Sequence, residues 1–204
     1  QQFVRVVDYK SGAKAFRLAD IVNGLNLQMF LYLFNVCADG SNPYAGVPAG
    51  VLYMHAARSV MTVETKRSAE KDIAGQEDKA FGMNGIVITN PDCDIPAAME
   101  HDLAGKYIPV RLKKSGVGGS LASLEQLGLL QRKIEALVAD MGNALQNGQI
   151  GQHPVQAKDH DKTCEYCDFA SVCAFKKSVT PRTYDDQTDS AVLAELEKEG
   201  ESHA

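Results

Sequence analysis

The chain has 204 residues, of which 45% are hydrophobic and 23% are charged, with a formal net charge of −5. This composition is typical of a folded globular protein and excludes a wholly disordered chain, a collagen-like repeat and a small disulfide-rich scaffold. No apolar run approaches the roughly 20 residues that a membrane-spanning helix needs, so we expect no membrane partner. The chain starts at Gln1 without a methionine and leads directly into a strand-like pattern, so we expect it to be part of a longer protein.

The negative charge is concentrated at the C-terminal end. Residues 185–204 hold seven acidic residues and one basic residue, which leaves the rest of the chain close to neutral. A nearly neutral body can still hold a local basic groove, so the total charge does not exclude nucleic acid as a partner. We predict one domain over residues 1–184, followed by a disordered acidic tail with at most a short helix near residues 192–198.

Three strands and one buried helix are predicted in the first half of the chain. Phe3–Lys10 is rich in β-branched residues and predicts a strand, which we expect to lie centrally in a sheet. Residues 20–36 are apolar almost all round and predict one buried helix. Residues 50–55 and 85–89 predict two further strands. The polar segment 58–79 shows little periodicity and fits a lid, a short helix or an insertion.

The second half predicts one more strand and a long helix. Residues 107–113 have a strand pattern, and Gly116–Gly119 predicts a flexible link. Ser120 or Ser123 can cap a helix that runs to about Gln146, where Asn147 and Gly148 form a stop signal. Strands and helices in this order predict an α/β fold with a mixed central sheet flanked by helices.

Asp8 and Lys10 are the first candidate functional residues. Side chains two apart on a strand point to the same face, so this carboxylate and this ammonium stand together at the end of a hydrophobic strand. A carboxylate can bind a hard cation such as Mg²⁺, and a neighbouring ammonium can orient water or offset phosphate charge. Taken alone, however, an Asp-x-Lys pair is more typical of a solvated strand end than of a catalytic site.

Gln28 and Tyr32 are four residues apart on the predicted helix and therefore share one face. Gln28 lies in the apolar segment Leu-Gln-Met-Phe-Leu-Tyr-Leu-Phe, where a buried amide would need partners. One interpretation is a core glutamine bonded to a core tyrosine. The functional interpretation is a pair directed towards Asp8 and Lys10.

The cysteines predict a metal or cluster site rather than disulfides. The chain has five, an odd number, and three of them lie within ten residues as Cys-x2-Cys-x5-Cys: Cys164, Cys167 and Cys173. This usage favours a reducing compartment, the cytoplasm. Three thiolates can share zinc or an iron–sulfur cluster, and a fourth ligand within the chain would be Cys37, Cys93 or His160.

Taken together, these motifs resemble a known family. The block Asp8-Tyr9-Lys10-Ser11-Gly12, the segment from Gly24 to Tyr32 and the cysteine pattern are similar to the nuclease core of the PD-(D/E)xK superfamily, in the branch of RecB-type and AddB-type helicase–nucleases. The resemblance implies a restriction-endonuclease-like fold, truncated at its N-terminus. It implies Asp8 and the Tyr9 carbonyl as Mg²⁺ ligands, Lys10 as catalytic lysine, and Gln28 and Tyr32 as support.

The same resemblance implies cofactors and partners. Residues 160–177 would form an iron–sulfur loop, in which Cys164, Cys167 and Cys173 hold a [4Fe–4S] cluster with a fourth ligand before Gln1. A further metal ligand would also precede Gln1, so we expect the isolated chain to be inactive. The implied function is an exonuclease that cuts single-stranded DNA unwound by a helicase subunit, in double-strand break repair and recombination, with the rest of its own chain as a further partner.

Two other functions remain open at this point. A stand-alone, Cas4-like exonuclease would share these motifs, but the long segment between Tyr32 and Cys164 argues against it. A catalytically inactive iron–sulfur module that holds DNA or a protein is disfavoured by the intact Asp8 and Lys10. No Gly-x-x-x-x-Gly-Lys-Ser/Thr loop is present, so we expect no ATP hydrolysis by this chain. Basic residues 111, 113 and 114 favour a solvated strand edge over a DNA contact.

Overall fold

The structure is a computed structural model that describes residues 1–12, 14–38, 40–56, 81–158, 164, 167–173 and 181–202. The chain forms two compact units: Gln1–Phe16 with Gln28–Gly128, and Arg17–Leu27 with Leu129–Ala204. The predicted lid or insertion at 58–79 lies outside the described residues. No described helix combines the length and hydrophobicity that a bilayer crossing requires.

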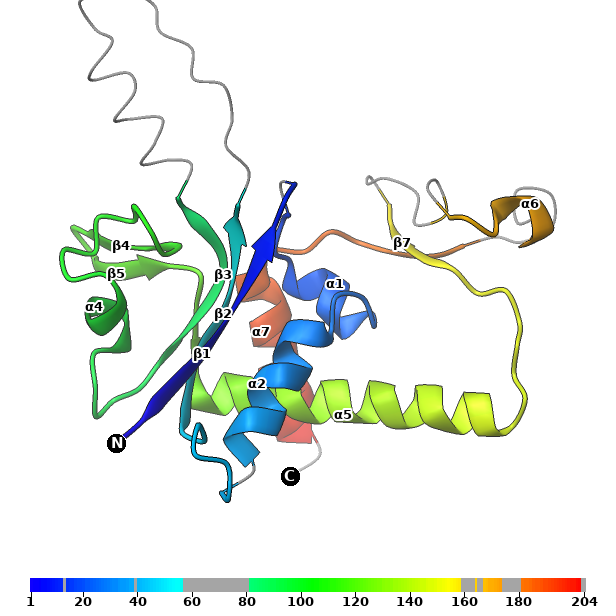
Figure 1. The fold of residues 1–204 in the computed structure, drawn as a ribbon, viewed down its shortest axis with the longest axis horizontal. Coiled ribbons are helices and arrows are strands. Elements are labelled where there is room, and N and C mark those ends of the chain that lie inside the picture. Colours follow the sequence, from blue (N-terminus) through cyan, green and yellow to red (C-terminus); the bar gives the residue numbers. More distant parts are fainter. Residues whose placement is uncertain are drawn as a thin grey trace, which may run out of the picture. The chain divides into compact units, whose positions relative to one another are not determined.

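The first unit is built on a four-stranded mixed sheet in the order β1-β2-β3-β6. Figure 1 shows β1, β2 and β3 of this sheet side by side. Its strands are β1 (Phe3–Lys10), β2 (Val47–His55), β3 (Met83–Thr89) and β6 (Leu121–Ser123). β1 runs parallel to β2, β2 antiparallel to β3, and β3 parallel to β6. The predicted α/β class and the strands predicted at 3–10, 50–55 and 85–89 are confirmed.

β1 lies at the edge of this sheet, so the predicted central position is wrong. The two inner strands are β2 and β3. Residues Ala49 to Tyr53 of β2 are buried, whereas Arg5 and Tyr9 on β1 are exposed. A strand can be covered on both faces and still lack a neighbour on one side. The apolar run in β1 therefore predicts that the faces of the strand are covered, but it does not predict the position of the strand in the sheet.

Different elements cover the two faces of the sheet (Figure 1). Helix α2 (Gln28–Ala38) contacts β1 and β2 on one face. On the other face lie the short helix α4 (Ile95–Met99) and a two-stranded sheet of β4 (Val110–Lys113) and β5 (Gly116–Gly119). Side chains from the sheet, from α4 and from β4 form one buried apolar cluster there, against which Phe3 and Val7 of β1 pack.

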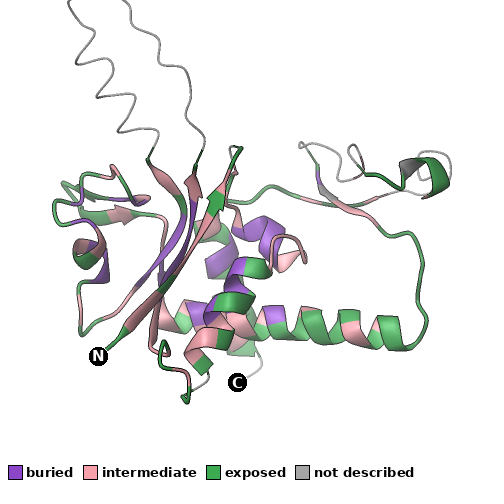
Figure 2. Cartoon of the chain, in the orientation of Figure 1, coloured by how far each residue is buried: buried purple, intermediate pink, exposed green. Residues whose placement is uncertain are grey.

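The helix predicted over residues 20–36 is in fact two helices, α1 (Leu18–Val22) and α2. Gly24 and Asn26 between them have positive φ angles of 88° and 55°, which a right-handed helix cannot continue. The expectation of burial on all sides is also wrong, because Leu31 and Tyr32 on α2 are exposed. Figure 2 shows exposed stretches along this helix. The hydrophobicity of the segment hid both the break and the exposed face.

Gly116–Gly119 is a strand rather than the predicted flexible link. It pairs with β4, and a Cβ atom on Gly119 would lie 2.2 Å from the carbonyl oxygen of Pro109, so only glycine permits this approach. The long helix is confirmed as α5 (Leu124–Gln146). Of the two predicted caps, Ser123 is the one used: its Oγ accepts from the Gln126 N–H at 3.1 Å, and Gln126 Oε1 accepts from the Ser123 N–H at 2.8 Å.

The second unit contains α1, most of α5, β7 (Val155–Ala157), α6 (Ala170–Cys173), β8 (Arg182–Tyr184) and α7 (Asp189–Ser202). The predicted disordered tail is contradicted by α7, a helix of 14 residues. Val192, Leu193 and Leu196 are buried on it, spaced as one apolar stripe that faces the unit. The high charge of the tail lies on the remaining faces, and charge alone did not reveal the stripe.

A buried carboxylate, Asp20, organises the interior of the second unit. Its side chain accepts a 2.6 Å hydrogen bond from the Tyr184 hydroxyl and further bonds from Arg17 and Asn26. Burial and the bond to Asp20 raise the pKa of Tyr184 well above its ordinary value. The group is therefore a neutral hydroxyl that stabilises the buried carboxylate.

Candidate active site

Asp8 and Lys10 form an ion pair at the C-terminal end of β1. Lys10 Nζ lies 2.5 Å from Asp8 Oδ2, and both side chains retain about a third of their exposure, at 36% and 31% respectively. The hydrogen bond to Asp8 raises the pKa of Lys10, although partial desolvation opposes the shift. The lysine is thus a cation held next to a carboxylate that solvent and substrate can still reach.

This pair lies on the face of the sheet that α2 covers. Tyr53 of β2 is the register partner of Asp8, so its side chain shares that face, and Lys10 Nζ lies 5.7 Å from the centre of its ring. The ring of Tyr53 contacts Phe16, which in turn contacts Phe30 of α2. Sequence reasoning missed Tyr53 as a neighbour of the pair, because the alternation of residues 50–55 identified the strand but not the register that joins it to β1.

Gln28 and Tyr32 form a second pair, at the N-terminal end of α2. Gln28 Nε2 donates to the Tyr32 hydroxyl at 2.7 Å, and both residues are exposed. The interpretation as a buried core pair is therefore wrong. Among the described residues, no hydrogen bond or ion pair joins this pair to Asp8 or Lys10, and the role of Gln28 and Tyr32 stays a prediction.

Asp8 and Tyr9 offer oxygen ligands of the kind that Mg²⁺ prefers. The Lys10 carbonyl accepts from the Ala56 N–H, so the alternation along β1 directs the Tyr9 carbonyl away from β2, to the open edge of the sheet. Within the described part of the chain, no three His, Cys, Asp or Glu side chains are placed to hold a metal ion. Mg²⁺ usually keeps several waters and uses one or two carboxylates, so one carboxylate with one carbonyl fits a partial site.

Cys164, Cys167 and Cys173 are free thiols in the second unit. Cys164 and Cys173 are half-buried and Cys167 is exposed. Their chemistry fits a thiolate-bound metal or cluster, but the described residues do not bring all three together as a ligand group. Cys37 and Cys93 are also free, and both lie in the first unit, whereas His160 is outside the described residues.

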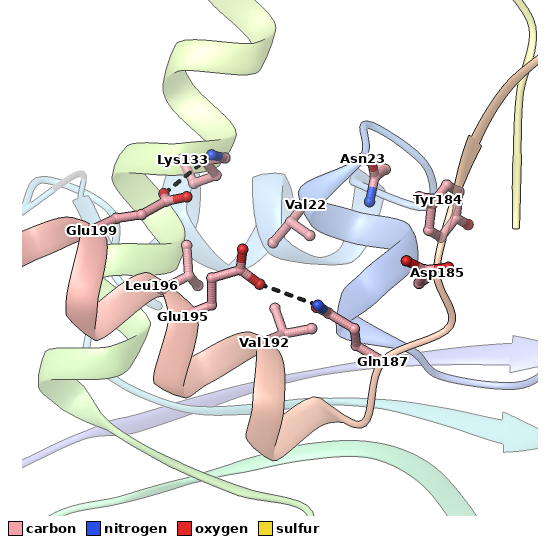
Figure 3. A pocket seen from close by; sticks show the side chains of 10 residues that line it. All are labelled: Val22, Asn23, Lys133, Tyr184, Asp185, Gln187, Val192, Glu195, Leu196 and Glu199. Atoms are coloured by element: carbon pink, nitrogen blue, oxygen red, sulfur yellow. Dashed lines mark hydrogen bonds and ion pairs between the residues drawn. The ribbon is translucent and has the colours of Figure 1, made fainter.

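A pocket of about 350 Å³ in the second unit contains none of the predicted site residues (Figure 3). It lies between α1, α5, β8 and α7, and its polar groups already have partners. Lys133 Nζ donates to Glu199 at 3.2 Å, and Gln187 donates to Glu195 at 3.3 Å. The pocket is therefore a packing feature of this unit and does not define a site for the predicted chemistry.

Comparison with known proteins identifies the family. The sequence profile of the PD-(D/E)XK nuclease superfamily matches residues 1–174, which include the Asp8–Lys10 pair and the three clustered cysteines. The chain belongs to the PD-(D/E)XK nuclease superfamily. The Asp-Tyr-Lys sequence at residues 8–10 has the spacing that the (D/E)XK part of the superfamily name describes.

The chain is also similar to subunits of helicase–nucleases. An ATP-dependent helicase/deoxyribonuclease subunit of Bacillus cereus (strain ZK / E33L) is 32% identical over 210 residues, which cover 97% of this chain and 18% of that protein. Its counterparts in Bacillus thuringiensis subsp. konkukian and in Bacillus anthracis are 32% and 31% identical with the same coverage. The resemblance to helicase–nuclease subunits is confirmed, and the chain spans less than a fifth of the length of these relatives.

Proposed function

We propose that this chain is the nuclease domain of a helicase–nuclease subunit and hydrolyses phosphodiester bonds of single-stranded DNA. A helicase partner would unwind the DNA during double-strand break repair and recombination in the cytoplasm. The observation that carries the proposal is the Asp8–Lys10 ion pair, accessible at the end of β1 inside the matched nuclease region. The relatives named as helicase/deoxyribonuclease subunits support the association with a helicase.

In this proposal Asp8 and the Tyr9 carbonyl hold Mg²⁺, with waters and DNA phosphate as its remaining ligands. The metal would supply charge neutralisation and a water of lowered pKa. Lys10 contributes a fixed positive charge, which binds a phosphate oxygen and stabilises the charge that develops on it. Gln28 and Tyr32 contribute an amide and a hydroxyl that can orient the substrate from α2.

For the cysteines we propose a [4Fe–4S] cluster held by Cys164, Cys167 and Cys173, with a structural role. The free state of all three thiols and their close spacing support this. Iron analysis and visible absorption of anaerobically prepared protein test it. Stoichiometric zinc without iron would show that the cysteines bind zinc and not a cluster. A protein that contains neither metal would contradict the proposal.

Two alternatives make different predictions. A stand-alone, Cas4-like exonuclease would cut without a helicase partner, but relatives that match 97% of this chain are far longer helicase/deoxyribonuclease subunits, which favours the first function. An inactive iron–sulfur module would bind DNA and leave it intact. The accessible Asp8–Lys10 pair favours an active enzyme over such a module.

Degradation of end-labelled oligonucleotides tests the proposal. The complete protein with its helicase partner should degrade single-stranded DNA in Mg²⁺ and not in EDTA. The variant Asp8→Asn should lose this activity, whereas Asp92→Asn, an exposed carboxylate in the same unit, should retain it. Equal cutting by wild type and Asp8→Asn would show that β1 does not carry the chemistry.

A further inference from the structure

β4 and β5 form an exposed antiparallel ribbon, residues 110–119, that we call the basic ribbon. Residues 103–120 contain four basic residues and no acidic residue, although the whole chain has a net charge of −5. Every residue from Arg111 to Val117 is exposed (Figure 2). The ribbon is therefore a local concentration of positive charge on an otherwise acidic chain.

The register of the ribbon gathers its charge on one face. Arg111 is opposite Gly118 and Lys113 is opposite Gly116, so neither basic side chain faces another side chain across the pair. Leu112, between them on β4, points to the other face. The Lys113 stem lies across Gly118, where its last two carbons and its Nζ are each 3.3 Å from the position that a Cβ would take.

The basic ribbon is held in shape from its base. The buried carboxylate of Glu100 accepts hydrogen bonds from the backbone N–H groups of Lys106, Tyr107 and Ile108, which lead into β4. Burial by itself would raise the pKa of Glu100, but these bonds outweigh it and lower the pKa, so the group is charged at neutral pH. The cationic face is thus preformed rather than created on binding.

The cations on this face are available for a partner. Within the described ranges, Arg111 and Lys113 form no ion pair, in contrast to Lys10, Lys133 and Lys158. Cations that are already paired with carboxylates of the same protein attract an anionic ligand only weakly. Unpaired cations on a rigid edge attract a polyanion more strongly. A guanidinium matches two phosphate oxygens at once, and an ammonium adds a point charge.

We infer that the Arg111–Lys113 face of the basic ribbon binds backbone phosphates of the single-stranded DNA substrate. The inference rests on the proposed function and adds a DNA-binding surface outside the Asp8–Lys10 pair. Phosphate contacts fix the position of a strand without reading its sequence, which suits a nuclease that must act on DNA of any sequence. This changes the sequence-based interpretation of these residues as a solvated edge.

Fluorescence anisotropy with a labelled oligo-dT in EDTA tests the inference on the full chain. Each phosphate contact contributes about 0.7 to the slope of log affinity against log salt for single strands. The ratio of the affinity at 50 mM salt to the affinity at 200 mM salt should therefore be about seven-fold smaller in Arg111→Gln/Lys113→Gln, which loses two contacts, than in the wild type. The control pair Arg132→Gln/Lys198→Gln removes two exposed charges on α5 and α7 and should keep the wild-type slope.

The charge-preserving variant Arg111→Lys/Lys113→Arg should also keep the wild-type slope of log affinity against log salt concentration. An unchanged slope in Arg111→Gln/Lys113→Gln, equal loss in the control pair, or no DNA binding by wild type would overturn the inference. Cleavage by the complete protein separates the two proposals. If Arg111→Gln/Lys113→Gln lowers the salt dependence of DNA binding but the complete protein cuts no DNA, only the proposed function is contradicted. If the complete protein cuts DNA but this variant leaves the salt dependence unchanged, only the inference about the basic ribbon is contradicted.

Discussion

Replacement of Glu100 by glutamine is expected to destabilise the base of the basic ribbon. Glu100 is 7% exposed and bonds three backbone N–H groups at 2.9–3.0 Å. Oε2 accepts from Tyr107 and Ile108, and Oε1 accepts from Lys106. An amide has a single acceptor oxygen, so Glu100→Gln keeps at most the two bonds at one oxygen and turns an NH₂ donor towards the third N–H.

The expected loss is about 3 kcal/mol of unfolding free energy at pH 7. A hydrogen bond to a charged group contributes about 1.5–3 kcal/mol, and the two remaining bonds lose their charge assistance. The folded-state pKa of Glu100 is lower than its pKa in the unfolded chain. The stabilisation by its carboxylate is therefore complete at pH values above the unfolded-state pKa, and it is lost as the pH falls through the folded-state pKa. The difference between wild type and variant should therefore be largest at neutral pH and shrink in acid.

Urea denaturation followed by circular dichroism measures the free energy, and hydrogen exchange of residues 100–120 locates the effect. The variant Asp92→Asn makes the same change of acid to amide at an exposed site of the same unit and should cost almost nothing. A loss below about 1 kcal/mol in Glu100→Gln, or one that persists unchanged at low pH, would show that the carboxylate does not hold the ribbon.

Three further changes test other parts of the structure. Tyr184→Phe removes the 2.6 Å bond to buried Asp20 and should lower the unfolding free energy by about 1.5–3 kcal/mol in urea denaturation; no change would mean that the bond does not form in solution. Leu52→Ala, at a fully buried position of β2, should cost about 2–5 kcal/mol in the same assay, and a negligible cost would contradict the central place of β2. Asp8→Asn should lower the pKa of Lys10 in an NMR titration, because the bond to Asp8 is the largest cause of its raised pKa; an unchanged value would argue against the ion pair.

Local sequence signals predicted the parts of the fold that depend on local physics. The β-branched run of β1 needs only neighbouring residues and agrees with the structure to the residue. The helix cap is also a local signal, and the structure uses Ser123, one of the two serines that the sequence offered. The Asp8–Lys10 pair follows from strand alternation alone, and the structure brings the two together. These features are determined within one element, which is why a single sequence is enough to find them.

Features that depend on distant partners were not predictable in the same way. The edge position of β1 depends on the strand order. The strand at Gly116–Gly119 is formed by pairing with β4, and Gly119 is needed because the Pro109 carbonyl lies so close to it. The helix α7 is stabilised by three buried side chains within an acidic segment. The proximity of Tyr53 to Lys10 depends on the register between β1 and β2. In each case the deciding contact lies outside the segment that carries the signal.

The most direct test of the central claim measures metal binding and DNA cleavage together in two variants of the complete protein. Asp8→Asn should lose both Mn²⁺ binding, followed by electron paramagnetic resonance, and single-turnover cleavage, because Asp8 is the proposed ligand. Lys10→Gln should keep most of the metal binding and still lose cleavage by at least about a hundredfold, because Lys10 acts on the phosphate rather than on the metal. Cleavage at the wild-type rate by either variant would contradict the assignment of the Asp8–Lys10 pair as the catalytic centre.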